Sequence, residues 1–90
     1  MSIPAMYAEV NQAAAATVKS IRGDLCGFIC TSSTGGTLTI YDNTAASGTE
    51  IYSALALTAG QTVTFYPAIT MKNGIHVVVG GTGNVKVLYR

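Results

Sequence analysis

Charge is scarce in this 90-residue chain, and tryptophan is absent. Only 10% of the residues are charged, against roughly 25% in an ordinary soluble domain, while 49% are hydrophobic. The formal net charge is +1, and the five basic residues are scattered along the sequence. Such a surface neither repels its own copies nor attracts phosphate. It therefore argues against nucleic-acid binding and favours a protein whose faces are covered in an assembly.

Long apolar runs are also missing. Glycine, threonine or a charged residue interrupts every run before it reaches the roughly 20 apolar residues of a membrane span. The N-terminus has neither the basic nor the apolar segment of a secretory signal. We therefore expect a chain that folds in the cytoplasm of the cell that makes it and has no membrane partner.

Cysteine occurs only twice, as Cys26 and Cys30 in one apolar segment. On a strand, their Cα atoms would lie about 13 Å apart, because each residue advances the chain by about 3.3 Å. A disulfide needs Cα atoms within about 7 Å, so these two residues cannot pair with each other. We expect free thiols that act as small buried hydrophobes in a reducing compartment.

Groups for catalysis are few, since the chain has one histidine and four carboxylates. A histidine-based triad needs a nucleophile and an orienting group, and we interpret His76 instead as a residue on the solvent or interface face of a strand. Asp42 and Glu50 bracket a long loop and could approach each other, but paired catalytic carboxylates need a cleft, and turn formation explains Asp42. We predict no catalytic residue, no cofactor and no small-molecule substrate.

Three further patterns in the sequence have the residue types of binding sites. Zinc needs three or four ligands within about 2.3 Å of one point, which strand geometry denies to the cysteines and His76. The 42–50 loop offers oxygen ligands for calcium, although its pattern is not specific, and we predict no metal site. Arg22-Gly23-Asp24 matches an adhesive tripeptide, for which a turn between two strands is the simpler explanation.

What the chain has in abundance is period-two alternation of β-branched and aromatic residues, punctuated by glycine. Asn73-Gly74 is the strongest hairpin signal. The pattern predicts an all-β fold, a small two-sheet β-sandwich of jelly-roll or Ig-like type with about seven or eight strands. The expected strands cover residues 17–21, 25–31, 37–41, 49–57, 61–66, 68–72, 75–79 and 84–90.

The N-terminal residues 1–14 lack this alternation, and we predict that they form an arm preceding a domain of residues 15–90. Four apolar residues in the arm have helix-like spacing and could dock on a neighbouring subunit. A frayed terminus is the alternative. Together with two tyrosines of the domain, which we expect at interfaces or sheet margins, the candidate partner-binding residues are Ile3, Met6, Tyr7, Val10, Tyr41 and Tyr52.

Three segments carry a resemblance to a known group: Leu38–Ile51, Asn73–Val77 and Gly81–Arg90. They read as a strand ending in Tyr-Asp, a small-residue loop with Ser-Gly-Thr, an Asn-Gly hairpin and a final Val-x-Val-x-Tyr strand. Through these segments, the chain resembles the short β-sandwich structural proteins of tailed bacteriophages. The resemblance covers roughly residues 20 to 90. The resemblance implies a virion component without catalytic residues.

We therefore expect a capsid cement or decoration subunit on the virion surface, binding across neighbouring copies of the major capsid protein and contacting copies of itself. A homotrimer would suit local three-fold positions, although no residue pattern in the sequence specifies a trimer. One alternative is a structural protein of the tail or of the head–tail junction. Another is a carbohydrate- or receptor-binding module, which would need a platform of exposed aromatic rings. Its candidates are Tyr41, Tyr52, Tyr66 and Tyr89.

Overall fold

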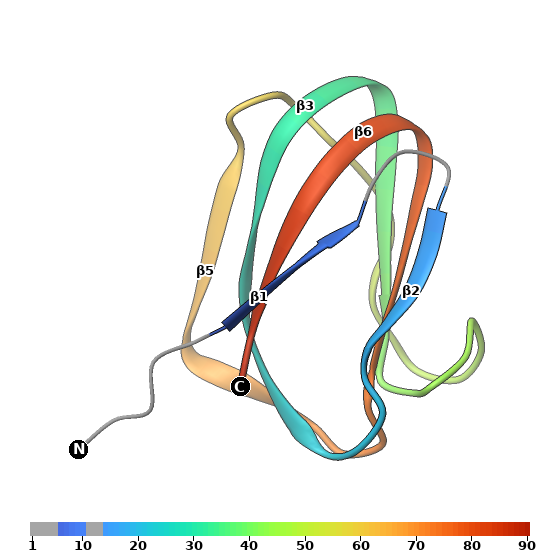
Figure 1. Cartoon of the computed structure of the whole chain (residues 1–90), viewed down its shortest axis with the longest axis vertical. Coiled ribbons are helices and arrows are strands. Elements are labelled where there is room, and N and C mark those ends of the chain that lie inside the picture. Colours follow the sequence, from blue (N-terminus) through green and yellow to red (C-terminus); the bar gives the residue numbers. More distant parts are fainter. Residues whose placement is uncertain (1–5, 11–13) are drawn as a thin grey trace.

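The computed structural model describes residues 6–10 and 14–90, and its regular structure is entirely β, as predicted. Every strand pairing is antiparallel, and all strands belong to one sheet (Figure 1). Within the described residues there is no helix, and so none that could cross a membrane. The six strands are β1 (Met6–Val10), β2 (Ala14–Lys19), β3 (Gly23–Tyr41), β4 (Glu50–Ala56), β5 (Thr62–Met71) and β6 (Ile75–Tyr89).

The two long strands, β3 and β6, pair with each other along nearly their whole length. Leu25 near the start of β3 lies opposite Tyr89 at the end of β6, and Tyr41 lies opposite His76. Both strands bend at the same level, where Figure 1 shows them turning over together. Gly35 and Gly81 have positive φ angles of 67° and 69° at this level, a conformation that glycine adopts without steric cost. The bends fold the sheet onto itself.

The folded sheet has two halves that share β3 and β6. In one half, the order is β1-β6-β3-β5, with β1 on the end of β6 and β5 on the start of β3. In the other half, the order is β2-β6-β3-β4, with β2 on the start of β6 and β4 on the end of β3. Each of the four shorter strands is therefore an edge strand.

The hydrophobic core lies between the two halves. Alternation along β3 and β6 sends every second side chain inward, where none of the described core residues is more than 7% exposed. Burial of a large aliphatic or aromatic side chain stabilises a fold by roughly 1.5–3 kcal/mol, so these residues hold the halves together. The core consists of Val10, Leu25, Phe28, Cys30, Leu38, Ile40, Leu57, Met71, Ile75, Val77, Val79, Val85 and Val87.

The predicted count of seven or eight strands is not confirmed, because several expected strands are joined. The polar segments 32–36 and 80–83, predicted as turns, are bends within β3 and β6, and pairing continues through them. The strands expected at residues 61–66 and 68–72 are likewise joined in the single strand β5 (Thr62–Met71), which contains Pro67. Proline lacks the amide donor, but β5 is an edge strand and tolerates it.

The Asn73-Gly74 hairpin was predicted wrongly. β5 and β6 both pair with β3 rather than with each other, so the link between them crosses from one half to the other. Gly74 has a φ of 137°, and a Cβ there would lie 2.8 Å from the carbonyl oxygen of Lys19. The Asn73 amide donates a 2.8 Å hydrogen bond to Oδ1 of Asp42. Glycine is thus needed here for space and conformation, but not for a hairpin.

The N-terminal arm also needs correction. Met6–Val10 form β1, which pairs with β6 from Met6 opposite Tyr89 to Val10 opposite Val85. This segment alternates as a strand does, because Val10 is buried while Tyr7 and Glu9 are exposed on the other face. The helix-like spacing of the apolar residues concealed this short alternation in the sequence. Residues 1–5 and 11–13, and with them Ile3, lie outside the described residues.

Gly27 is the glycine with the least room, and it provides a test of the β3–β5 packing. It lies at a register shift in β3, its φ is 148°, and a Cβ on it would overlap the carbonyl oxygen of Val63. We expect Gly27→Ala to lower the free energy of unfolding by about 3 kcal/mol or more, since backbone strain and overpacking add. Urea denaturation measures this loss.

The matched control is Gly60→Ala. Gly60 has a φ of 85°, but no atom lies within 4 Å of a Cβ built there. Only the conformational penalty of about 1 kcal/mol is therefore expected. Equal losses at the two glycines would contradict the packing described around Gly27.

Candidate interaction surface

A cross-strand row of four residues runs along the outer face of the β2-β6-β3-β4 half. Thr17 lies opposite His76, His76 opposite Tyr41, and Tyr41 opposite Glu50. The neighbours of His76 along β6, Ile75 and Val77, point into the core, which fixes His76 on the outer face. The row therefore gathers the only histidine of the chain with hydroxyl groups and a carboxylate.

His76 is held in this row by a hydrogen-bond chain. Oγ1 of Thr17 donates to the carbonyl oxygen of Thr44 at 3.0 Å and lies 3.0 Å from Nδ1 of His76. The Thr17 hydroxyl therefore lies within hydrogen-bonding distance of both groups, and the tautomer of His76 sets whether Nδ1 donates to it or accepts from it. The Tyr41 ring lies beside the imidazole, with 6.2 Å between ring centroids. The Nδ1 atom is therefore engaged in tying β6 to β2 and to the 42–49 loop.

The 42–49 loop is built from its own side chains. The side-chain amide of Asn43 donates to the Ser47 carbonyl at 2.9 Å, and its Oδ1 accepts the Thr44 amide at 2.8 Å. Asp42 closes the loop through a 2.8 Å backbone bond to Thr49, and its carboxylate accepts the Asn73 amide. Asp42 thus has the turn-forming role that the sequence indicated.

Over residues 6–10 and 14–90, no group of three or more His, Cys, Asp or Glu side chains could hold a metal ion, and no pocket is formed. Cys26 and Cys30 are free thiols, as predicted. Cys30 is buried, with its Sγ donating to the Ser32 carbonyl at 3.3 Å, but Cys26 is only partly buried, so the predicted burial holds for Cys30 alone. Gly23 and Asp24 belong to β3, where Asp24 exchanges backbone hydrogen bonds with Arg90. The Arg-Gly-Asp tripeptide is therefore not displayed on an exposed loop.

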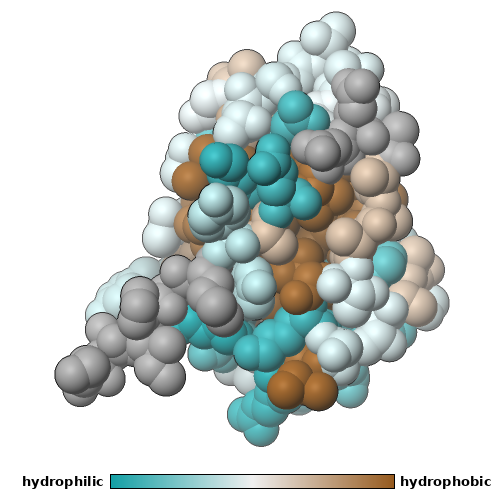
Figure 2. Space-filling view, viewed as in Figure 1, coloured by the Kyte–Doolittle hydropathy of each residue, from teal (hydrophilic) through white to brown (hydrophobic). Residues whose placement is uncertain are grey.

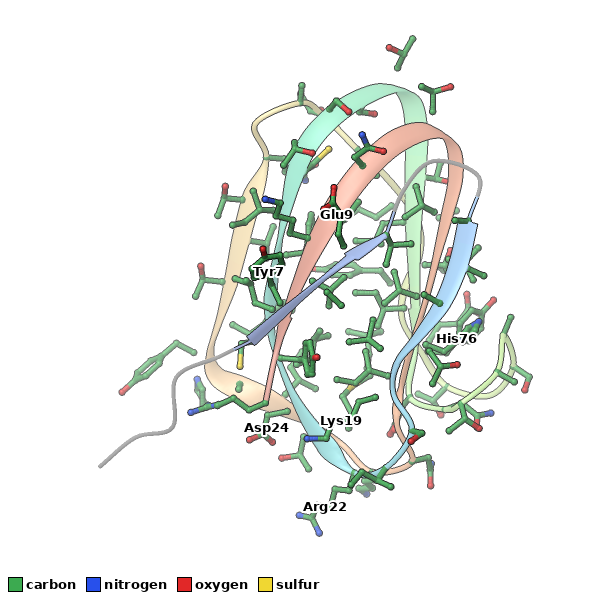
Figure 3. All side chains as sticks on the ribbon, viewed as in Figure 1. Tyr7, Glu9, Lys19, Arg22, Asp24 and His76 are labelled. Atoms are coloured by element: carbon green, nitrogen blue, oxygen red, sulfur yellow. The ribbon has the colours of Figure 1, made fainter. Side chains whose placement is uncertain are left out.

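The outer face of the β1-β6-β3-β5 half carries Tyr7, which is 60% exposed. Lys86 on β6 places its Nζ 5.2 Å from the centre of the Tyr7 ring, within the range of a cation–π contact. Figure 3 shows Tyr7 and Glu9 on β1 at this face. Of the other predicted partner-binding residues in this strand, Val10 is only 2% exposed and presents no surface, and the Met6 side chain lies outside the described residues.

Tyr52, another predicted partner residue, packs among core aromatic residues. Its ring meets Phe28 edge-on with 5.7 Å between centroids and lies 6.0 Å from Phe65. Burial raises the pKa of its phenol above the usual 10.0. Tyr89 also packs against the core, whereas Tyr66 is 98% exposed beside Pro67. The tyrosines are therefore divided between core and surface rather than gathered as one platform.

Ile21, which is 68% exposed, was missed from the sequence, whereas Tyr66 was a candidate only for the aromatic platform of a ligand-binding module. The alternation of β5 contained a signal for Tyr66, because Phe65 faces inward and its neighbour must then face out. Ile21 was expected within a strand of residues 17–21, whereas β2 ends at Lys19 and leaves Ile21 outside it.

The fold also sorts the charges. Lys19 ends β2, Arg22 precedes β3, Lys72 follows β5, and Arg90 bonds to Asp24, so four of the five basic residues meet at one end of the molecule. Figure 3 labels two of these basic residues, Lys19 and Arg22, at that end, together with Asp24. At the opposite end, where β3 and β6 bend, segments 31–37, 57–62 and 80–84 contain no charged residue. Figure 2 shows that end as mostly pale, weakly polar surface.

The Thr17 hydrogen-bond chain generates a stability prediction. Thr17→Val keeps the side-chain shape but leaves His76 Nδ1 and the Thr44 carbonyl without their shared partner. We expect a loss of about 1 kcal/mol in urea denaturation and faster amide exchange in the 42–49 loop. Thr17→Ser retains the hydroxyl and should keep the loop protected. Unchanged exchange in the valine variant would rule out a role for this chain in holding the loop.

The raised pKa of Tyr52 predicts a loss of stability in alkali. The unfolded chain releases the phenol proton near pH 10, while the folded chain retains it, so the stabilisation is complete below pH 10 and is lost as the pH rises through the folded-state pKa. Tyr52→Phe keeps the ring and should flatten this decline in denaturation measured from pH 8 to 11. Tyr66→Phe, at an exposed ring, is the control expected to decline as the wild type does. Parallel curves for wild type and Tyr52→Phe would refute the assignment.

No family model, curated protein or solved structure matches this chain. No relative therefore supplies functional residues that could be transferred to positions in this sequence. The strand order, the sorting of charge and the exposed side chains are the features from which a function can be inferred.

Proposed function

We propose that this chain is a structural protein of a tailed-bacteriophage virion, a cement or decoration subunit that binds across neighbouring major capsid proteins. The observation that carries the proposal is the strand order of the two halves. β3 and β6 each contribute to both halves, so the six strands supply eight segments. Their orders are β1-β6-β3-β5 and β2-β6-β3-β4.

We propose that this arrangement is a jelly-roll sandwich. The chain changes halves at the links before β2, β3, β5 and β6 and at both bends, and it stays in one half only at the 42–49 loop. Jelly rolls of eight strands are built in this way from two Greek keys, and they recur in viral capsid proteins and in lectins. Fold alone does not decide function, so the surface has to separate these classes.

The surface supports docking to protein. A charge-free end of Gly, Ser and Thr can be covered by a coat subunit without stripping water from ionised groups, which is the costly part of burying polar surface. The charged residues at the other end would remain in solvent. In this arrangement, each subunit links adjacent coat proteins through its bend end, and the links resist expansion of the shell.

A carbohydrate-binding role has less support. It would need several aromatic rings on one face, whereas Tyr52 and Tyr89 pack against the core and Tyr66 stands alone on β5. A place in the tail rather than on the capsid would use the same fold and surface. Copy number separates these two locations.

Mass spectrometry of purified particles tests the proposal. We expect the chain in the virion at hundreds of copies, on the order of the number of capsomer contacts in a symmetric shell. A count of a dozen copies or fewer per particle would instead assign the protein to the tail or the head–tail junction. Its absence from particles would overturn the virion assignment altogether.

Rebinding to shells that lack the protein tests the docking end. Thr34→Glu introduces a charge at an exposed position of the bend end, and Thr70→Glu introduces the same charge at an exposed position near the charged end of β5. We expect Thr34→Glu to lower occupancy at least tenfold and Thr70→Glu to bind as the wild type. Equal binding of both variants would contradict docking through the bends.

A further inference from the structure

The four edge strands differ in how well they are protected against pairing with another chain. An edge strand presents unpaired amide and carbonyl groups, and natural proteins block such edges with proline, bulges or charges. In this protein, β5 contains Pro67 in mid-strand. β4 has register shifts and a positive φ of 51° at Ala54, which bend it away from a regular edge. β1 carries the exposed charge of Glu9.

β2 has none of these protections in its first part. From Ala14 to Thr17 it pairs with β6 in unbroken register, and the irregularity comes only between Thr17 and Lys19. The segment contains neither proline nor charge, and Lys19 stands at its very end. Among the described strands, β6 is the one partner of β2, so its other edge offers regular backbone hydrogen-bonding groups to a further strand.

The apolar side chains along the same edge indicate that a protein partner covers it rather than water. The inward-facing side chains of β2, Ala14, Ala16 and Val18, are only partly buried and pack against the core. Figure 2 shows apolar surface along the seam between β1 and β2. A strand added beside β2 would supply hydrogen bonds to the backbone and cover this apolar row in one step.

We infer that the occupant is β2 of a second copy of this chain, paired antiparallel to form a two-fold dimer with one sheet running across both molecules. An antiparallel strand pair places the same surface on both sides, so one sequence can complement itself. The antiparallel arrangement also sets the two Lys19 residues at opposite ends of the contact, which avoids repulsion. Self-pairing of β1, which is only five residues long, would instead place the two Glu9 residues close together, on either side of the central Ala8.

The edge is ordered before it binds. Thr17 is tied to His76 on β6 and to the Thr44 carbonyl of the 42–49 loop, each at 3.0 Å. These contacts fix the end of β2 without using its free edge, so pairing does not have to order the strand. The inference does not depend on a virion role, since the isolated chain tests it, and it gives a two-fold contact in place of the three-fold oligomer expected for capsid sites.

Sedimentation equilibrium of the full chain, up to about 1 mM, is the first test. We expect a mass that rises from 9.3 kDa to twice that value. In the register that sets Ala15 opposite Ala15 of the second copy, Ala15→Lys places a charge on an exposed side chain of β2 and should weaken dimerisation at least tenfold, because like charges then face each other across the strand pair. Thr62→Lys adds the same charge at an exposed position of β5 and should dimerise as the wild type.

Nuclear Overhauser contacts in a mixed sample of labelled and unlabelled chains locate the interface independently of the variants. The expected contacts join the methyl groups of Ala14–Ala16 in one copy to those of the other. A monomer at every concentration, a trimer, an equal effect of both lysine variants, or contacts confined to another strand would each overturn the inference.

Discussion

The pairing of β3 with β6 is the constraint on which the rest of the structure depends. These are the only two strands present in both halves of the sheet, and every other described strand pairs with one of them. Their inward side chains supply most of the core, including Phe28, Leu38 and Val85. Because both strands bend at the same level, the ladder continues through the bend and the two halves are held face to face without a separate linker.

The sequence predicted where alternation occurs but not how the alternating segments join. Residues 25–31 and 37–41 were correctly expected to be extended, as were 75–79 and 84–90. A Gly-Gly-Thr-Gly segment is, however, compatible with both a turn and a bend, and the choice depends on whether a partner strand follows it. Here the 32–36 and 80–83 segments bend side by side, a relation that no local pattern records. Asn73-Gly74 shows the same limit, since its glycine conformation was foreseeable and its strand partners were not.

The candidate site was predictable only where it followed from strand geometry. His76 was placed on a strand face from its apolar neighbours, but its partner Thr17 is 59 residues away in the sequence and was found only in the fold. Val10 was assigned to a partner surface because helix-like spacing obscured a short edge strand, and it proved to be core. The basic residues are scattered along the sequence, but the strand ends bring four of them together in space, which sequence order alone does not show.

The low charge content of the chain and the unprotected edge of β2 both favour association with another protein. Charges on edge strands are a common means of keeping soluble proteins apart, and a chain with only 10% charged residues has few to place there. This chain protects β1, β4 and β5 by a charge, a bulge and a proline, and leaves β2 regular from Ala14 to Thr17. A surface that is inexpensive to desolvate and an edge that is ready to pair are disadvantages for a free monomer, because both promote association. In an assembly the same two properties become the means of attachment, which is why the charge deficit and the β2 edge are best understood together.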